Sequence, residues 1–310
     1  MSAKTFDLYA HVTDTIVAAI EAGATDFSLP WQRTGIGNML PVNAATGAAY
    51  NGVNILSLWA TAMNSGYDRG VWATYRQWAS LGAQVRKGAR GACVIFYKEY
   101  SAEPDPDDDA DDGKRRVAKA SWVFNAAQVE GYALPDLPDR PPIERRVMAE
   151  VLVEKNGADI RHGGDQAYYV PSADYIQMPD ERLFAAEDEA QRTEDYYAVL
   201  FHELTHWAGA KYRLDREMHK RFGDRAYAME ELVAELGAAF LCGELGITPA
   251  PRPDHAGYIA GWLEAMKADK RAIFTAAARA GEAASFLNRV LKRARGGASS
   301  AAMPGVGEPS

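Results

Sequence analysis

The chain is poor in cysteine and contains no long uninterrupted run of apolar residues. Cys93 and Cys242 are its two cysteines among 310 residues, and neither stands in a Cys-x-x-Cys pair. A disulfide framework is therefore excluded, and we expect both side chains to pack as small apolar groups in a reducing compartment. No apolar stretch approaches the ~18 residues that a membrane span requires.

The N-terminal segment also lacks the features of a signal peptide. Asp7, Asp14 and Glu21 interrupt the apolar residues there, and this is the pattern of an amphipathic helix. These absences predict a cytoplasmic protein with no membrane partner.

The chain has no overall positive charge. Its net charge of −8 argues against a protein that coats nucleic acid with its whole surface, but it allows a local basic patch. Seven of the 42 acidic residues fall in 103–112, EPDPDDDADD, which is typical of a disordered loop. Because the flanking segments 92–100 and 117–125 have the composition of strands, we predict a hairpin whose tip carries an acidic insert at 101–116.

Proline is concentrated in one short segment, where it predicts a boundary. Four prolines fall in residues 134–142, LPDLPDRPP, and this composition is typical of an extended linker. The length of the chain fits two domains. We therefore predict an N-terminal domain at 1–133, a linker at 134–142, a C-terminal domain at 143–296 and a disordered tail at 297–310.

The hydrophobic pattern predicts an α+β fold, with a small α+β first domain and a mostly helical second domain that contains a small sheet. Before the strand pair, helices are expected at 5–22, 52–64 and 74–81. In the second domain, helices are expected at about 142–155, 194–210, 226–245 and 255–294, the last of them broken, with short strands inside 159–180. Thr74 and Thr193 are expected to cap the helices that follow them.

A metal-binding motif stands at 202–206, where the sequence is His-Glu-Leu-Thr-His. On a helix His202 and His206 share one face, so both imidazoles can reach one metal ion, and Glu203 can act as general base to a water on that ion. With six histidines in the chain, chance alone would give about 0.007 such matches. We therefore expect a metal site here, with zinc as the ion and one ion per chain.

The third ligand is expected from the downstream segment Glu-Glu-Leu-Val-Ala-Glu at 230–235. Glu231 and Glu235 are four residues apart and share a helical face. We predict that Glu231 binds the metal and that Glu235 accepts the N–H of a ligand histidine. Glu230 lies one position off this face, so we expect it to be solvated.

Other candidates for the site are weaker. The extended motif HExxHxxGxxH is matched at Gly209, but Tyr212 stands where it has a third histidine, and tyrosine is a poor zinc ligand. His219 lies in a charged stretch and is expected to be solvated. His255 opens a predicted helix as a capping residue, and either it or Tyr258 is a secondary candidate for stabilising an oxyanion.

Acidic residues are missing from 69–98, a stretch that is rich in cations and aromatic rings. Single-stranded nucleic acid is bound by this combination, because cations neutralise phosphates while ring faces stack on bases. An alternative is that most of the rings form a small core, and of Trp72 and Trp78 one is expected to be buried. The predicted DNA contacts are Arg69, Arg76, Arg86, Lys87, Arg90, Lys98 and Trp72.

Long segments of the chain resemble the ArdC-type antirestriction proteins, which are plasmid- and phage-borne and share their N-terminal domain with TraC-type primases. In the first half the resemblance rests on PVNAATGAAYNGVNILSLW (41–59), QVRKGARGACVIFYK (84–98) and WVFNAAQVEG (122–131). In the second half it rests on DIRHGGDQAYYVPSADYIQMP (159–179), HELTHWAGAKYRLDR (202–216), FGDRAYAMEELVAELGAAFLCGELGI (222–247) and HAGYIAGWLEAMKADKRAIFTAA (255–277).

The resemblance implies a single-stranded DNA-binding N-terminal domain joined to a zincin-like metallopeptidase domain. It also implies a role in shielding incoming DNA from host restriction during conjugation or infection. Two alternatives stay open: an active zinc protease that cleaves an unidentified host protein, and a DNA-binding shield whose metal is purely structural. The presence of Glu203 favours a capacity for hydrolysis, because a structural site does not need that carboxylate.

Overall fold

In a computed structural model of the chain, the structure describes residues 7–23, 40–67, 69–101, 114–133, 142–184, 188–216, 225–247 and 256–300. The N-terminal half combines helices with a four-stranded sheet of order β1-β2-β5-β4 and a two-stranded sheet of β3 and β6. Its elements are α1 (Leu8–Gly23), β1 (Val42–Asn43), α2 (Val53–Ser65), β2 (Val71–Thr74), α3 (Tyr75–Ser80), β3 (Gln84–Val85), β4 (Ala92–Ser101), β5 (Lys114–Asn125) and β6 (Val129–Glu130).

The predicted hairpin is present as a long antiparallel ribbon of β4 and β5. Its register runs from Ala92 opposite Val123 to Ser101 opposite Lys114, while the acidic residues between the strands lie outside the described part of the chain. Helix α2 lies beside the free edge of β4. There the Asn54 side chain replaces a neighbouring strand, since it donates to the carbonyl oxygen of Ile95 and accepts from its N–H, both at 2.7 Å.

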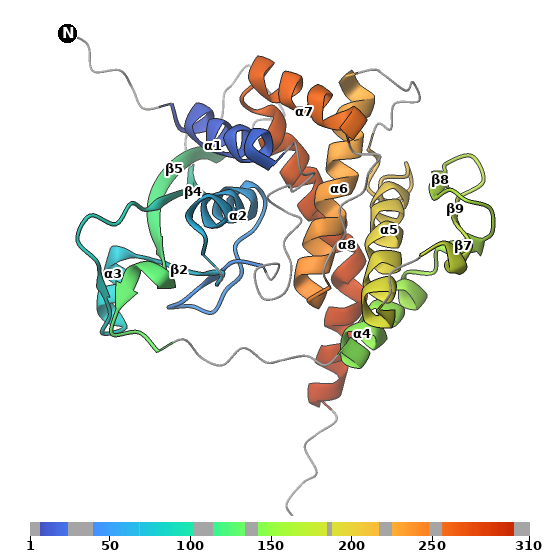
Figure 1. The fold of residues 1–310 in the computed structure, drawn as a ribbon, viewed down its shortest axis with the longest axis horizontal. Coiled ribbons are helices and arrows are strands. Elements are labelled where there is room, and N and C mark those ends of the chain that lie inside the picture. Colours follow the sequence, from blue (N-terminus) through green and yellow to red (C-terminus); the bar gives the residue numbers. More distant parts are fainter. Residues whose placement is uncertain are drawn as a thin grey trace, which may run out of the picture.

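The C-terminal half is mostly helical, as expected, with one small sheet of order β7-β9-β8. Figure 1 shows α4, α5, α6 and α8 gathered into a bundle, with the small sheet beside α5. The elements are α4 (Pro142–Asn156), β7 (Asp159–His162), β8 (Tyr168–Val170), β9 (Tyr175–Met178), α5 (Glu189–Ala208), α6 (Arg225–Leu245), α7 (Ala256–Ala268) and α8 (Ala272–Ser300). The α+β fold predicted from the sequence is confirmed.

Three details differ from the sequence prediction. Helix α5 begins at Glu189, and its N-cap is Asp188, whose side chain accepts a hydrogen bond from the backbone of Ala190. The prediction that Thr193 caps this helix is therefore wrong, whereas Thr74 does cap α3 in a capping box with Gln77. Helix α8 continues to Ser300, four residues into the segment expected to be a disordered tail.

The two halves of the chain share one hydrophobic core. Residues of α1 and α2, such as Ile16 and Trp59, belong to the same buried cluster as residues of α6 and α8, such as Phe240 and Leu287. The rings of Trp59 and Phe240 are 6.2 Å apart. Removing either half would expose this core, so experiments on function are best made with the full chain. The predicted linker falls almost wholly outside the described residues, and the domain boundaries remain predictions.

None of the helices in the described ranges is both long and apolar enough to cross a bilayer.

Helices α5 and α6 approach each other closely because glycine stands at their contact. A Cβ atom on Gly237 of α6 would lie 2.5 Å from the Cγ2 atom of Thr205 on α5. Thr205 cannot easily turn away, since it is fully buried and its hydroxyl donates to the carbonyl oxygen of Phe201 at 2.8 Å. Only a residue without a side chain allows this spacing between the two helices.

We expect Gly237→Ala to destabilise the protein by about 1–3 kcal/mol, because the added methyl overpacks the contact between α5 and α6. The free energy of unfolding from urea denaturation measures this effect. Gly281→Ala on α8 is the matched control, since a Cβ there meets no atom within 4 Å and helix propensity favours alanine. Adding Thr205→Ala to Gly237→Ala should restore part of the loss. Equal stability of the Gly237→Ala variant and the wild type would contradict the steric explanation.

Candidate metal centre

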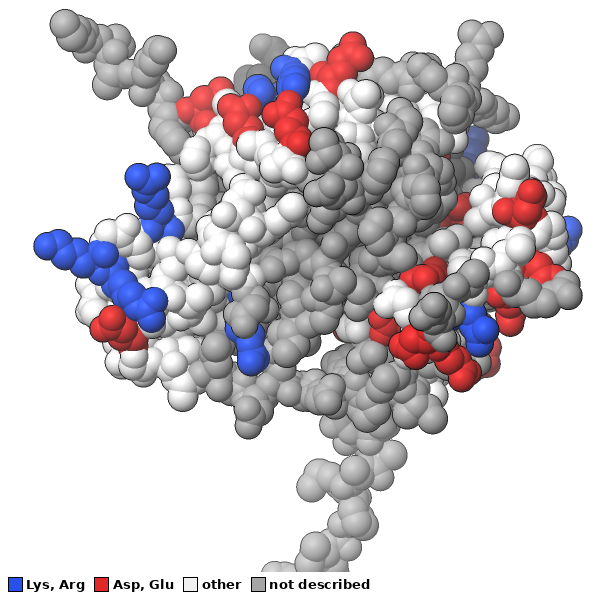
Figure 2. All heavy atoms as spheres, viewed as in Figure 1, with Lys and Arg blue, Asp and Glu red and all other residues white. Residues whose placement is uncertain are grey.

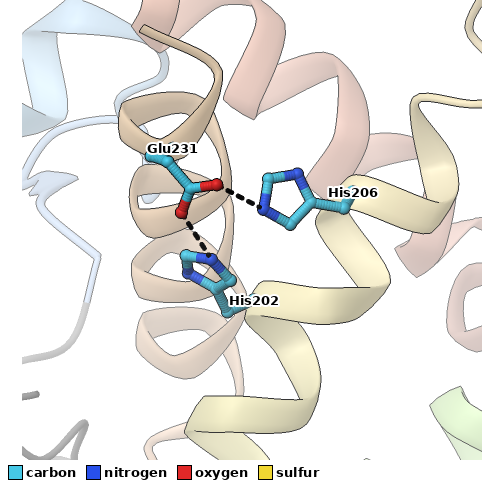
Figure 3. Close-up of side chains that lie close together, drawn as sticks. All are labelled: His202, His206 and Glu231. Atoms are coloured by element: carbon cyan, nitrogen blue, oxygen red, sulfur yellow. Dashed lines mark ion pairs between the residues drawn. The ribbon is translucent and has the colours of Figure 1, made fainter. Parts of the chain in front are cut away.

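The predicted motif lies in the last turns of α5, on the face that meets α6. His202 and His206 are one helical turn apart, and their ring centroids are 4.9 Å from each other at an interplanar angle of 73°. Both side chains are shielded from solvent. Figure 3 shows the two imidazoles pointing from α5 toward the same carboxylate on α6.

That carboxylate is Glu231, the residue predicted as third ligand. Its two oxygens lie 3.4 Å from Nε2 of His202 and 3.5 Å from Nε2 of His206. One ligand atom from each of these three residues lies within 4.8 Å of the others. Two imidazole nitrogens and one carboxylate oxygen that converge in this way fit a divalent cation and leave coordination positions open.

Glu231 is held in its ionised form. Burial would raise the pKa of its carboxyl group, but the hydrogen bond from His202 and the charge of His206 act in the opposite direction. Together with a hydrogen bond from the Tyr227 hydroxyl, they bring the pKa to about 2. The carboxylate is therefore ready to bind a cation at any physiological pH.

The outer nitrogen of each histidine faces a second carboxylate. Nδ1 of His202 lies 3.7 Å from an oxygen of Glu235, and Nδ1 of His206 lies 3.4 Å from an oxygen of Glu230. Such carboxylates fix the ring orientation and the tautomer of a ligand histidine. Glu235 lies beside the ring of His202, but 3.7 Å is too long for a hydrogen bond, so its role as acceptor of the Nδ1–H stays a prediction. The expectation that Glu230 is solvated is wrong, since its exposed fraction is 6%.

Arg216 compensates the charge of Glu230 in the interior. Its NH2 group donates to Glu230 at 2.8 Å and to the carbonyl oxygen of Thr205 at 2.6 Å. Burial would raise the pKa of Glu230, but the His206 hydrogen bond and the Arg216 charge outweigh it and lower the pKa. The guanidinium passes directly over Gly209, where a Cβ atom would lie 2.7 Å from it.

Sequence reasoning missed Arg216 and the role of Glu230. Each of two ligand histidines needs an acceptor for the ring nitrogen that does not bind the metal. This requirement would have pointed to a second carboxylate beside Glu235. Arg216 lies after the end of α5, outside any helix, so helical periodicity cannot predict that its side chain contacts the site.

A second cluster ties the end of α5 to the small sheet. Arg213 donates to Asp174, which lies between β8 and β9, and to the Tyr169 hydroxyl and the carbonyl oxygen of Trp207. The guanidinium of Arg213 brings the pKa of Asp174 down to about 2. These contacts fix the sheet against the helix that carries the two histidines.

Of the other candidate residues, Glu203 is buried and Tyr212 is exposed. Glu203, the predicted general base, follows His202 on α5 and has an exposed fraction of 3%. Tyr212, expected to be a poor ligand, is 66% exposed and is not among the three residues whose ligand atoms converge. His219, His255 and the side chain of Tyr258 lie outside the described part of the structure.

Most of the predicted DNA contacts lie on the surface of the N-terminal half. Arg76, Arg86, Lys87, Arg90 and Lys98 are exposed, and Arg69 is half-buried. Figure 2 shows Lys and Arg side chains projecting from the side of the molecule formed by β2, α3 and β5, whereas Asp and Glu gather near α1 and α7 and around the β7–β9 sheet.

Two of the predicted contacts, Trp72 and Arg86, are buried or partly engaged by other protein groups. Trp72 is 1% exposed, because its ring packs in a core with Leu58 and Val123. The prediction that it stacks on DNA is therefore wrong, and Trp78 is buried as well. Arg86 is exposed but partly engaged, since it donates to the carbonyl oxygen of Ala127 at 2.9 Å and pairs with Glu130 at 3.4 Å.

Known proteins match both halves of the chain. Residues 6–124 match the family described as the N-terminal domain of anti-restriction factor ArdC, and residues 147–279 match the zincin-like metallopeptidase family. An uncharacterized protein of Sinorhizobium fredii (strain NBRC 101917 / NGR234), y4eC, is 50% identical over 287 residues, covering 91% of this chain and 92% of its own length. The DNA primase TraC of Escherichia coli is 35% identical over 299 residues, which cover 89% of this chain but 26% of the primase.

Two solved structures of the antirestriction protein ArdC from plasmid R388 are also similar. Each is 40% identical in sequence to this chain. The metal-free crystal structure has a TM-score of 0.74 and covers 93% of this chain and 99% of its own. The Mn(II)-bound crystal structure has a TM-score of 0.72 and covers 92% of this chain and 98% of its own.

The fold and the site thus define a protein in which a small α+β half precedes a zincin-like metallopeptidase domain. The chain belongs to the ArdC family of antirestriction proteins.

We expect the purified protein to bind about one divalent metal ion per chain, and His202→Ala to lose most of it, because a ligand is removed. Elemental analysis after dialysis measures the metal content. His162→Ala is the matched control, since that histidine lies on β7, outside the ligand group. Full metal content in a His202→Ala/His206→Ala variant would show that the site is assigned to the wrong residues.

We expect Glu230→Gln to weaken metal affinity by about 10- to 100-fold, because glutamine cannot stabilise the His206 ring as a carboxylate does. Competition with a chelating dye gives the dissociation constant. Glu244→Gln on the same helix is the control, since Glu244 pairs with Asn288 away from the metal ligands. Unchanged affinity in the Glu230→Gln variant would mean that its carboxylate serves only to balance Arg216.

Proposed function

We propose that this protein is an antirestriction factor that binds single-stranded DNA through its N-terminal half and carries a zinc-dependent hydrolytic site in its C-terminal half. In this proposal it protects incoming plasmid or phage DNA from restriction in the host. The observation that carries the proposal is the match of nearly the whole chain to the antirestriction protein ArdC from plasmid R388. The E. coli TraC relatives are named as DNA primases, which supports contact with DNA.

The ligand group supports zinc as the ion in this chain. Two histidines and one glutamate with open coordination positions form a common set in catalytic zinc sites. The Mn(II)-bound structure of the R388 protein shows that another divalent ion is accommodated by a related protein. A bound divalent ion supplies a Lewis acid that polarises a carbonyl group and lowers the pKa of water.

The side chains of this site have separate tasks in hydrolysis. His202, His206 and Glu231 bind the ion, while Glu235 and Glu230 orient the two imidazoles through their Nδ1 atoms. Glu203 stands between the two histidines in sequence and is the proposed general base, which accepts a proton from the attacking water. In the alternative in which the protein is an active zinc protease, the substrate of this step is a host protein.

The second candidate function is a DNA shield in which the metal only stabilises the helices. The continuity of the core across both halves favours it, since a metal that joins α5 to α6 also stabilises the surfaces built on them. The two functions differ in their need for Glu203.

Plasmid transfer into restricting and non-restricting recipients distinguishes the two functions. If hydrolysis is required, Glu203→Ala should abolish protection while the protein keeps its metal, because loss of a general base costs about 10²–10⁴ in rate. His202→Ala should also abolish protection, and His162→Ala should not. Full protection by Glu203→Ala with loss in His202→Ala would favour the shield. Equal transfer with and without the wild-type protein in the restricting recipient would refute the antirestriction proposal.

A further inference from the structure

One face of the β4–β5 ribbon carries alternating aromatic and cationic side chains. Alternate residues of a strand project to the same side, and so do residues directly opposite each other on paired strands. The register places Phe96 opposite Lys119 and Lys98 opposite Val117. Together with Tyr100 of β4, these four residues form a single row, here called the ribbon stripe.

The ribbon stripe is open to solvent although much of it is apolar. Phe96 is 48% exposed, Tyr100 37% and Val117 47%. The ammonium groups of Lys98 and Lys119 lie 5.1 and 5.7 Å from the centre of the Tyr100 ring. An exposed apolar row of this kind marks an interaction surface, and its two lysines favour an anionic partner.

A cavity of about 730 Å³ lies at the inner end of the ribbon stripe. Phe96 lines it on the side of the ribbon, and Ala277 and Gly281 of α8 line it on the other side. No described residue that lines the cavity is charged, and its polar groups include the side-chain amides of Asn43 and Gln77. The volume is typical of a small-molecule site.

We propose that the ribbon stripe carries a run of single-stranded DNA whose bases stack on Phe96 and Tyr100, and that the cavity beside Phe96 receives one nucleobase. The inference rests on the proposed binding of single-stranded DNA and assigns the surface that performs it. The phosphates of the strand then pass Lys98 and Lys119.

The neutral lining of the cavity fits a base better than a phosphate. A phosphate in a cavity needs cationic partners, whereas base edges present donors and acceptors that side-chain amides match. The amides of Asn43 and Gln77 already hydrogen-bond to each other at 3.3 Å, so the polar wall is ordered before a ligand arrives. Small side chains on α8 leave a gap that a flat ring can enter.

Arg86 and Lys87, two of the DNA contacts predicted from the sequence, lie in or beside the turn at 87–88 and are here called the basic turn. The cations of the ribbon stripe differ from those of the basic turn in their pairing with acidic residues. Arg86 in that turn is paired with Glu130. On the ribbon the nearest acidic residue of β4, Glu99, alternates with Lys98 and Tyr100 and therefore lies on the opposite face. The five residues of the stripe thus combine rings for stacking with cations for phosphate neutralisation, and none of the five is acidic.

Fluorescence anisotropy of the full chain with two labelled oligonucleotides tests the proposal. The probes are oligothymidylate of about 20 nucleotides and an abasic strand of the same length. We expect the wild type to bind the base-bearing strand more tightly, with each base stacked on a ring of the stripe contributing about 5- to 150-fold. Phe96→Leu, which keeps the apolar bulk but removes the ring, should lower this preference by about 5- to 150-fold, the contribution of one base, and leave abasic binding unchanged.

Two further variants separate the cavity from the charged stripe. Gly281→Leu fills the cavity from α8 and should weaken binding of oligothymidylate at least about fivefold. The control Ser285→Leu, at an exposed position of α8 that does not line the cavity, should stay within about twofold of the wild type. Lys98→Ala/Lys119→Ala should lower the slope of affinity against salt by about 1.4, at about 0.7 for each lost phosphate contact. Melting temperatures confirm that the variants are folded.

The outcomes distinguish this inference from the proposed function. If the wild type binds neither strand at low salt, the binding of single-stranded DNA itself is refuted. If it binds but Phe96→Leu and Gly281→Leu bind like the wild type, while Arg86→Ala/Lys87→Ala loses affinity, the DNA site is the basic turn and the present inference is wrong. A stripe variant that changes only the oligomeric state would equally overturn it, since the stripe would then contact a second copy of the chain.

Discussion

The metal centre depends on one steric constraint, the close contact of α5 with α6 at Thr205 and Gly237. The three ligand side chains come from these two helices, and short side chains at the contact set the distance between them. A histidine side chain reaches only a few ångströms beyond its helix, so a wider spacing would leave Glu231 out of reach of His202 and His206. The absence of a side chain at residue 237 thus sets the spacing on which the ligand geometry depends.

The same contact buries an unusual concentration of negative charge. Glu203, Glu230 and Glu235 are buried, and Glu231 is nearly so, whereas Arg216 is the buried cation that the described residues bring to them. Buried carboxylates are costly without compensating charge. Arg216 compensates Glu230, and a divalent cation at Nε2 of the histidines would compensate Glu231 and its neighbours. The electrostatics of the protein alone therefore favour an occupied metal site.

The sequence predicted the residues of this centre that follow from spacing along a helix. It did not predict the contacts that depend on how α5 and α6 are placed relative to each other. His202, His206, Glu231 and Glu235 follow from four-residue intervals, which are local. The role of Glu230 depends on the position of His206 relative to α6, and a single sequence does not contain that relation. The predicted helix start at Thr193 failed for a different reason, because Asp188 is an equally good cap and the polar residues after it continue the helix.

Trp72 shows a limit of composition as a guide to binding surfaces. A segment with cations, rings and no acid predicts nucleic-acid contact, but it does not tell which rings are buried. The structure buries Trp72 on β2 and Trp78 on α3 and leaves Phe96 of β4 exposed, so the stacking surface that we propose lies on the ribbon.

The ribbon is in turn connected to the metal centre through α8. This helix lines the cavity with Gly281, and its buried residues, such as Leu287, pack into the core that contains α6. Asn288 of α8 also donates to Glu244 of α6, which ties the two helices beyond their apolar contact. Since protein interiors are closely packed and deform little, the cavity and the ligand helices are held at a fixed separation by one core. A strand of DNA on the ribbon would therefore lie at a defined position relative to the metal centre, which a pair of domains joined only by a flexible linker would not provide.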